Sequence, residues 1–218
     1  MNGVYSNPVF ILLGVAAVFI ALVLYFRWKR ARDLGELAAS MGLQFLPDGP
    51  ELNTLENTGL EIFRLGHSRK AANLVQVQSR AGTVNIFDYR FTIGHGKGSS
   101  TRAYTLALMA CSRCSVPVFE LKPETLLYKI GEAIGFKDID LPAFPLFSDK
   151  YRLTGPDESA VHMFFTPQRA AWFERNLGLR VQGAPGHIVM FKQEAQLPVN
   201  SWPDFIEEVK AFAAEVLG

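Results

Sequence analysis

Two cysteines separated by two residues, Cys111 and Cys114, have the clearest chemical precedent in this sequence. A C-x-x-C pair does redox chemistry when a helix N-terminus lowers the pKa of its first thiol, and it binds zinc when two further ligands lie nearby. Here the pair lies between two segments rich in strand-forming residues, the four histidines are scattered, and no second C-x-x-C exists. The sequence favours turn cysteines without a chemical role, and it leaves a thiol or metal module as an alternative.

Two other polar patterns carry less information. In the glycine-rich segment 94–101, backbone amides have room to surround a phosphate. A P-loop, however, needs a Ser or Thr directly after its lysine, where this chain has Gly98. Asp138 and Asp140 form a carboxylate pair that lacks a third oxygen ligand in the neighbouring sequence. We therefore predict no catalytic residue, no metal ligand and no cofactor, and the sequence leaves open whether the chain is an enzyme.

An uncharged apolar stretch, Pro8–Phe26, precedes all of these residues. Nineteen helical residues extend about 28 Å, close to the thickness of roughly 30 Å of a bilayer's hydrocarbon core. A cleaved signal peptide would have a basic start and a small-residue cleavage site, and neither is present. We predict a retained transmembrane helix over 8–26, preceded by a short extracytoplasmic tail over 1–7.

A basic juxtamembrane segment, 27–32, follows this stretch at once. Positive charge is retained on the cytoplasmic side of a membrane, which predicts an outside N-terminus and a cytoplasmic domain at the plasma (inner) membrane. Aromatic side chains at such a boundary are typical of an interfacial belt. The expected membrane-interface residues are Tyr25, Arg27, Trp28, Lys29, Arg30 and Arg32.

The formal net charge of +1 conceals a division of charge along the chain. Residues 33–218 carry 18 bases and 21 acids, a net charge of −3 that argues against nucleic-acid binding. Within them, 33–63 has acids only, whereas 64–102 has seven bases and a single acid, Asp88. We expect either an acidic face packed near a basic one, or a basic surface for anionic lipid or a phosphate-bearing ligand. Its cations would be Arg64, Arg69, Lys70, Lys97 and Arg102.

The hydrophobic period along 33–218 predicts a mixture of strands and helices. Loops or extended connections are expected over 52–59, 66–73 and 136–148. Helices are expected over 33–41, ending at Gly42 or continuing the apolar helix, and over 125–134, 158–165, 167–177 and 203–217. Strands are expected over 43–46, 61–65, 74–79, 83–92, 102–111, 116–121, 151–154, 179–182 and 187–192.

These elements predict an α+β fold, an antiparallel sheet with helices packed on one face, preceded by a single transmembrane helix. The length of 33–218 suits one cytoplasmic domain, with two sub-lobes at about 33–121 and 122–218 as a finer division. In the cytoplasm, the two cysteines are expected to be reduced thiols rather than a disulfide.

Several phrases resemble a group of uncharacterised bacterial proteins that join one N-terminal membrane helix to a cytosolic α+β domain. They are Val116-Pro-Val-Phe-Glu-Leu-Lys-Pro-Glu124, Asp138-Ile-Asp140, Phe147-Ser-x-x-Tyr151-x-Leu-x-Gly155 and Asp157-Glu158-x-x-Val161. The likeness covers about 115–215 best. It implies the same membrane anchor and fold class, and no assigned activity or site residue.

From these features we expect a single-pass membrane-anchored protein whose cytoplasmic domain is a binding or scaffold module. Its partners would be the membrane itself, anionic lipid, and a protein of a membrane complex. An enzyme of unrecognised type is the alternative, and a cavity of several hundred Å³ with ionisable groups at its base would favour it.

Overall fold

The chain is described by a computed structural model over residues 8–80, 82–111, 115–124, 138–192 and 196–217. Its centre is one eight-stranded sheet in which every pairing is antiparallel, so the predicted α+β fold class is confirmed. In spatial order the strands are β1 (Gln44–Asp48), β2 (His67–Ser79), β3 (Gly82–Ile93), β4 (Ser100–Ala110), β8 (His187–Lys192), β7 (Leu179–Ala184), β5 (Phe119–Pro123) and β6 (Tyr151–Thr154).

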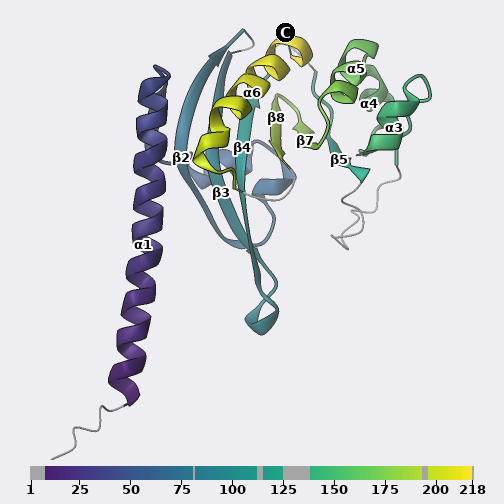
Figure 1. The fold of residues 1–218 in the computed structure, drawn as a ribbon. Coiled ribbons are helices and arrows are strands. Elements are labelled where there is room, and N and C mark those ends of the chain that lie inside the picture. Colours follow the sequence, from purple (N-terminus) through teal and green to yellow (C-terminus); the bar gives the residue numbers. More distant parts are fainter. Residues whose placement is uncertain (1–7, 81, 112–114, 125–137, 193–195, 218) are drawn as a thin grey trace, which may run out of the picture.

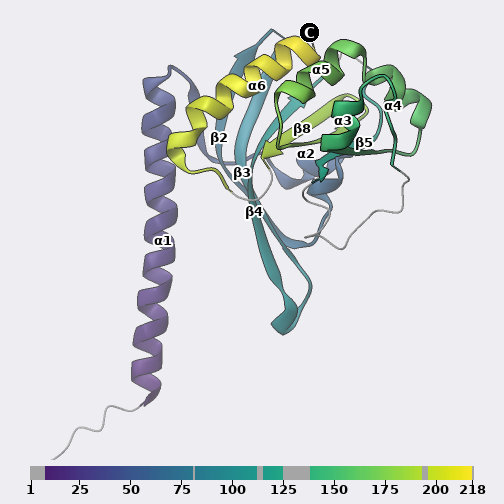
Figure 2. The same cartoon turned by 45° about the vertical axis from the view of Figure 1, so that its right-hand side comes forward.

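Helix α1 (Pro8–Ser40) is a single unbroken helix of 33 residues that stands beside β2 and extends well beyond the sheet (Figures 1 and 2). Gly42, two residues after the last helical residue Ser40, has a φ of +67°. The Leu43 amide donates to the Ala38 carbonyl and the Gly42 amide to that of Ala39, the bonds of a Schellman cap. The segment 33–41 is therefore a continuation of the apolar helix.

The two halves of α1 have different surroundings. The apolar window in its N-terminal half is wholly exposed, with side chains such as Phe10 and Phe19 about two-thirds uncovered or more. In the C-terminal half, Leu34 and Ala38 are buried against the sheet. By length and composition α1 is able to cross a membrane, and the exposed apolar side chains lie where lipid would cover them.

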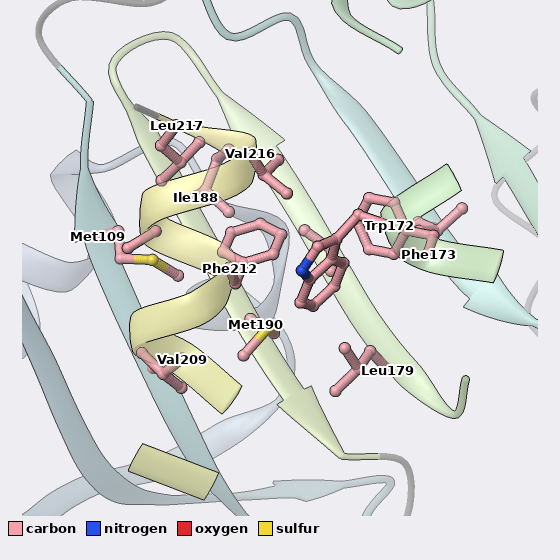
Figure 3. Close-up of a cluster of buried hydrophobic side chains, with 14 of the residues drawn as sticks. Met109, Trp172, Phe173, Leu179, Ile188, Met190, Val209, Phe212, Val216 and Leu217 are labelled. Atoms are coloured by element: carbon pink, nitrogen blue, oxygen red, sulfur yellow. The ribbon is translucent and has the colours of Figure 1, made fainter. Parts of the chain in front are cut away.

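The larger hydrophobic core lies on the face of the sheet that carries α1 and the helices of the C-terminal half. Helix α6 (Trp202–Val216) places Val209, Phe212 and Val216 over the strand residues Met109, Ile188 and Met190 (Figure 3). The Phe212 ring meets the edge of Trp172, with ring centroids 5.2 Å apart. Three further helices pack here: α3 (Pro145–Lys150), α4 (Glu158–Phe164) and α5 (Pro167–Arg175).

A second, aromatic core lies on the other face, where Phe87 and Phe91 of β3 alternate with the side chains of the first core. It is covered by the short helix α2 (Leu52–Asn57) and the 3₁₀ turn η1 (Glu61–Phe63). The sequence predicted a loop over 52–59 and a strand over 61–65, and both predictions are wrong. Such short turns have no stability of their own and form because Leu55 and Phe63 are buried.

The expected turn over 66–73 is also wrong, because β2 runs through it. Ser68 and Asn73 have positive φ angles of 52° and 56°, and the register with β3 shifts beside each of them. These bulges let polar residues remain in a long strand. The connection expected over 136–148 ends in α3, and the helix predicted over 125–134 lies outside the described residues.

Strands β3 and β4 extend beyond the rest of the sheet as a hairpin with the 3₁₀ turn η2 (Gly96–Gly98) at its tip. Both views show this hairpin pointing in the same direction as the apolar half of α1 (Figures 1 and 2). A last 3₁₀ turn, η4 (Val199–Ser201), leads into α6. The ends of β2, β3 and β4 near the hairpin therefore face the same side as the candidate membrane span.

Candidate functional site

A buried carboxylate, Asp88, joins α1 to the sheet. Its two oxygens accept hydrogen bonds from Arg30 Nε at 2.8 Å and Arg30 Nη2 at 2.9 Å. Asn73 Nδ2 donates to the same carboxylate at 2.8 Å and the Thr105 hydroxyl at 3.0 Å. The ring closes through Leu197, whose carbonyl accepts from Arg30 Nη2 and whose amide donates to Thr105 Oγ1. With four hydrogen-bond donors from three elements around it, this carboxylate has a structural role.

Local structure explains how these side chains meet. Asp88 and Thr105 are directly opposite in the β3–β4 register, so their side chains share a face. Asn73 reaches Asp88 from the bulge in β2, and Arg30 lies one turn before the buried Leu34 on α1. Sequence analysis missed this cluster and assigned Arg30 to the membrane interface. The signal was present, because Asp88 is the only acid among seven bases in 64–102.

A cleft of about 670 Å³ opens beside this cluster, between α1 and the strands β2, β3 and β4. On α1 it is lined by residues that straddle the end of the apolar stretch, including Leu24, Phe26 and Arg27. On the sheet it is lined by Lys70 and Arg90, and by Ala72 and Ala103, whose small side chains leave room between them.

The charges in the cleft are unbalanced. Arg30 and Asp88 neutralise each other, and among the described residues that line the cleft this leaves the cations Arg27, Lys70 and Arg90 against the carboxylate of Asp48. None of these three cations has an ion-pair or hydrogen-bond partner within the described part of the chain. The arrangement suits an anion.

Of the other predicted interface residues, Trp28 also lines the cleft, whereas Tyr25, Lys29 and Arg32 do not. Lys29 and Arg32 are paired with acids one turn further on, at 3.5 Å from Asp33 and 3.4 Å from Glu36. The Arg32 guanidinium carbon lies 5.2 Å from the centroid of the Trp28 ring. Trp28 is exposed, and so is Tyr25, whose ring lies beside that of Trp28.

The five cations proposed from sequence as an anion surface do not form one group. Lys70 is the only one in the cleft. Arg69 is engaged with the Phe63 carbonyl and with Glu56 at 3.0 Å. Arg64 follows η1 on the second face, Lys97 is at the hairpin tip, and Arg102 is opposite Phe91 and so also faces away from α1.

A smaller cleft of about 290 Å³ lies near Glu120 and Gln182. Glu120 accepts from Arg180 Nη2 at 2.7 Å and Gln182 Nε2 at 3.0 Å, and its other oxygen is 2.7 Å from Lys122 Nζ. Burial would raise the pKa of the Glu120 carboxyl, but Arg180 and Lys122 hold this pKa below its ordinary value. Glu120 is therefore also a structural anion rather than a proton acceptor.

Cys111 corrects the expectation of reduced thiols, because it is disulfide-bonded in this structure. The only other cysteine of the sequence, Cys114, lies outside the described residues. Asp138 also has a structural contact, since its carboxylate accepts from the Leu153 amide at 3.1 Å. Among the described residues, no three His, Cys, Asp or Glu side chains are grouped as metal ligands.

A comparison with protein-family models gives no match, and neither does a comparison with curated protein sequences. Among solved structures, the chain is similar to the crystal structure of the mycobacterial trehalose monomycolate transport factor A, TtfA. The TM-score is 0.53 at 14% sequence identity, over 87% of this chain and 96% of that one. At this identity the likeness concerns the fold alone, and the chain shares that fold over most of both proteins.

Proposed function

We propose that this chain is a single-pass membrane-anchored accessory protein whose folded domain, residues 33–218, is a non-enzymatic binding or scaffold module. In this proposal 8–26 spans the inner membrane, 1–7 lie outside, and the domain lies on the cytoplasmic side because the basic segment 27–32 follows the span. The observation that carries the proposal is the Arg30–Asp88 contact, which joins the helix of the candidate span to the sheet. A domain held in this way has a set height and direction relative to the membrane.

The fold similarity supports a role in a membrane assembly. The protein of similar fold is described as a transport factor. By analogy, this chain would act by positioning its domain beside a membrane partner. In this chain both clefts contain a buried carboxylate that is occupied by structural donors, which favours a binding module over an enzyme.

Exposed apolar side chains on the helical end of the domain are candidate partner contacts. Leu146 of α3, Met163 of α4 and Leu177 after α5 are each more than half exposed. Large apolar side chains that stay exposed are typical of protein interfaces when they gather on one surface.

The topology is tested with a tag after Gly218 in intact spheroplasts treated with an impermeant protease. Survival of the tag until the membrane is opened is the expected result, and its loss would place the domain outside. Trapping of free thiols in the same cells adds a second readout. The disulfide-bonded Cys111 of this structure would resist alkylation if the domain lay in an oxidising compartment, so its alkylation in intact cells would support the cytoplasmic side.

The partner is tested with a photo-crosslinking residue at position 146, 163 or 177 of the full chain in cells. A discrete adduct with an integral membrane protein is expected at one or more of these positions. A matched position on an exposed polar surface, Arg80, should give none. Absence of adducts at all three apolar positions would argue against a protein partner at this end of the domain.

A further inference from the structure

We infer that the cleft between α1 and strands β2, β3 and β4 binds the phosphate-bearing headgroup of an anionic phospholipid, with Arg27, Lys70 and Arg90 as its cationic contacts. The inference rests on the proposed membrane anchoring and names a ligand for it.

Two like charges lie side by side on the sheet surface of the cleft. Lys70 and Arg90 are directly opposite each other in the β2–β3 register, which puts both side chains on the face that carries α1. Like charges in opposite positions destabilise a sheet. Neither has a counterion among the described residues, so an anion from outside the chain would remove this repulsion.

Along both α1 and β3, buried core residues are followed by charged residues toward the end of the apolar stretch. From the core outward, β3 presents Ile86, then Asp88, then Arg90 on one face. Alongside it, α1 presents the buried Leu34, then Arg30. Arg27, one turn further on, lines the cleft with Arg90 just where the uncharged stretch ends at Phe26. The cations are thus at the level where lipid phosphates would surround the helix.

The cleft has both cationic and apolar walls. Its cationic wall continues into Leu24 and Phe26, which belong to the apolar stretch itself. A headgroup bound by the cations would leave its acyl chains beside these apolar side chains. The volume of about 670 Å³ is sufficient for a glycerophosphate headgroup. Arg30 Nη1 has no hydrogen bond within the described residues, so it adds a donor for the phosphate.

Free phosphate compounds share this chemistry, but the structure favours a lipid. The cleft opens beside the end of the apolar stretch, and its lining includes two residues that would contact acyl chains. A soluble phosphate compound would make no use of Leu24 and Phe26.

The test uses the full chain in detergent micelles, titrated with phosphatidylglycerol and, separately, phosphatidylcholine, with bound lipid counted by native mass spectrometry. We expect selective binding of phosphatidylglycerol. The variant K70Q/R90Q should bind it about tenfold more weakly, the loss expected for a charge-assisted hydrogen bond or two. The matched control R64Q/R80Q removes the same charge from exposed sites outside the cleft and should change binding less than twofold. Asp48→Asn, which removes the unpaired carboxylate of the cleft, should strengthen binding.

Several results would overturn the inference. Equal binding of both lipids, or equal losses in the two double variants, would show general electrostatic attraction. Displacement of phosphatidylglycerol by free glycerol 3-phosphate at similar concentration would show a soluble ligand. A photoactivatable phosphatidylglycerol tests the wild-type chain without any variant, and it should label peptides that contain 24–31 or 70–73. Labelling confined to the hairpin tip would contradict the inferred site. Extraction of the wild-type chain from membranes by alkaline carbonate would refute the anchoring itself, whereas an integral protein without lipid selectivity would refute only this site.

Discussion

The Arg30 guanidinium and the Asp88 carboxylate meet through two hydrogen bonds of 2.8 and 2.9 Å, although they are 58 positions apart in the chain. Both side chains are largely buried, with 19% and 6% of their surface exposed. This contact fixes α1 to the centre of the sheet, so the helix is part of the folded domain and not only a flexible connection to the apolar stretch.

Asp88→Asn and Arg30→Met should each destabilise the fold by about 3 kcal/mol, because each leaves a buried charged or polar partner unpaired. The double variant should lose less than the sum of the two, since the second change removes what the first left unpaired. The measurement is denaturant unfolding of the full chain in micelles followed by circular dichroism. Lys29→Ala, which removes an exposed pair with Asp33, should change stability by less than about 0.5 kcal/mol. Strict additivity of the two single effects would contradict the direct contact.

Glu120 should make stability depend on pH. Its pKa is lowered in the folded protein, so its contribution is fully present above the ordinary value of 4.5 and is lost as the pH falls through the folded-state value. Glu120→Gln should cost about 3 kcal/mol at neutral pH, and the gap to wild type should close in acid. Thermal melts at a series of pH values measure this gap, with the exposed Glu207→Gln as a control that should show little difference at any pH.

Gly183 of β7 should not tolerate a side chain. A Cβ at this position would overlap the Phe119 ring and approach the Pro117 carbonyl oxygen to 2.8 Å. Gly183→Ala is therefore expected to separate β7 from β5 and to cost about 2 kcal/mol, as overpacked cores do. Gly98→Ala at the hairpin tip has open space around its Cβ and should be nearly neutral. A melting temperature for G183A equal to that of wild type would show that β5 moves freely.

Phe212 should be among the most sensitive core positions. It is fully buried between Trp172 and Phe173, and Phe212→Ala should cost about 4 kcal/mol. Met163→Ala at an exposed site should change stability by less than about 0.5 kcal/mol. Tryptophan fluorescence during unfolding reports both, because Trp172 contacts the altered ring.

The sequence predicted the elements that carry their own periodic signal. The stripe of α6 and the alternation of β3 reflect burial of one face, and both were identified within a residue or two of their bounds. The short helix α2 and the turn η1 were missed, because each is stabilised by burial of one or two side chains such as Leu55 and not by a local pattern.

The candidate site was predictable only in part. The basic segment 27–32 and Lys70 were identified from charge, but the residues that line the cleft come from four strands and α1. The register that sets Lys70 opposite Arg90 depends on the bulges at Ser68 and Asn73. A positive φ at a serine or an asparagine has no reliable sequence signature, so the grouping required the structure.

The unbroken course of α1 has a consequence for orientation around its axis. Each helical residue advances about 1.5 Å and turns roughly 100°, so the apolar half and the half packed on the sheet share a single helical phase. One residue inserted after Phe26 would therefore rotate the domain by roughly 100° about the helix axis and raise it about 1.5 Å. The same edge of the sheet therefore always faces a given side of the apolar half, and if that half spans a bilayer, a neighbour there would meet the domain at a fixed azimuth.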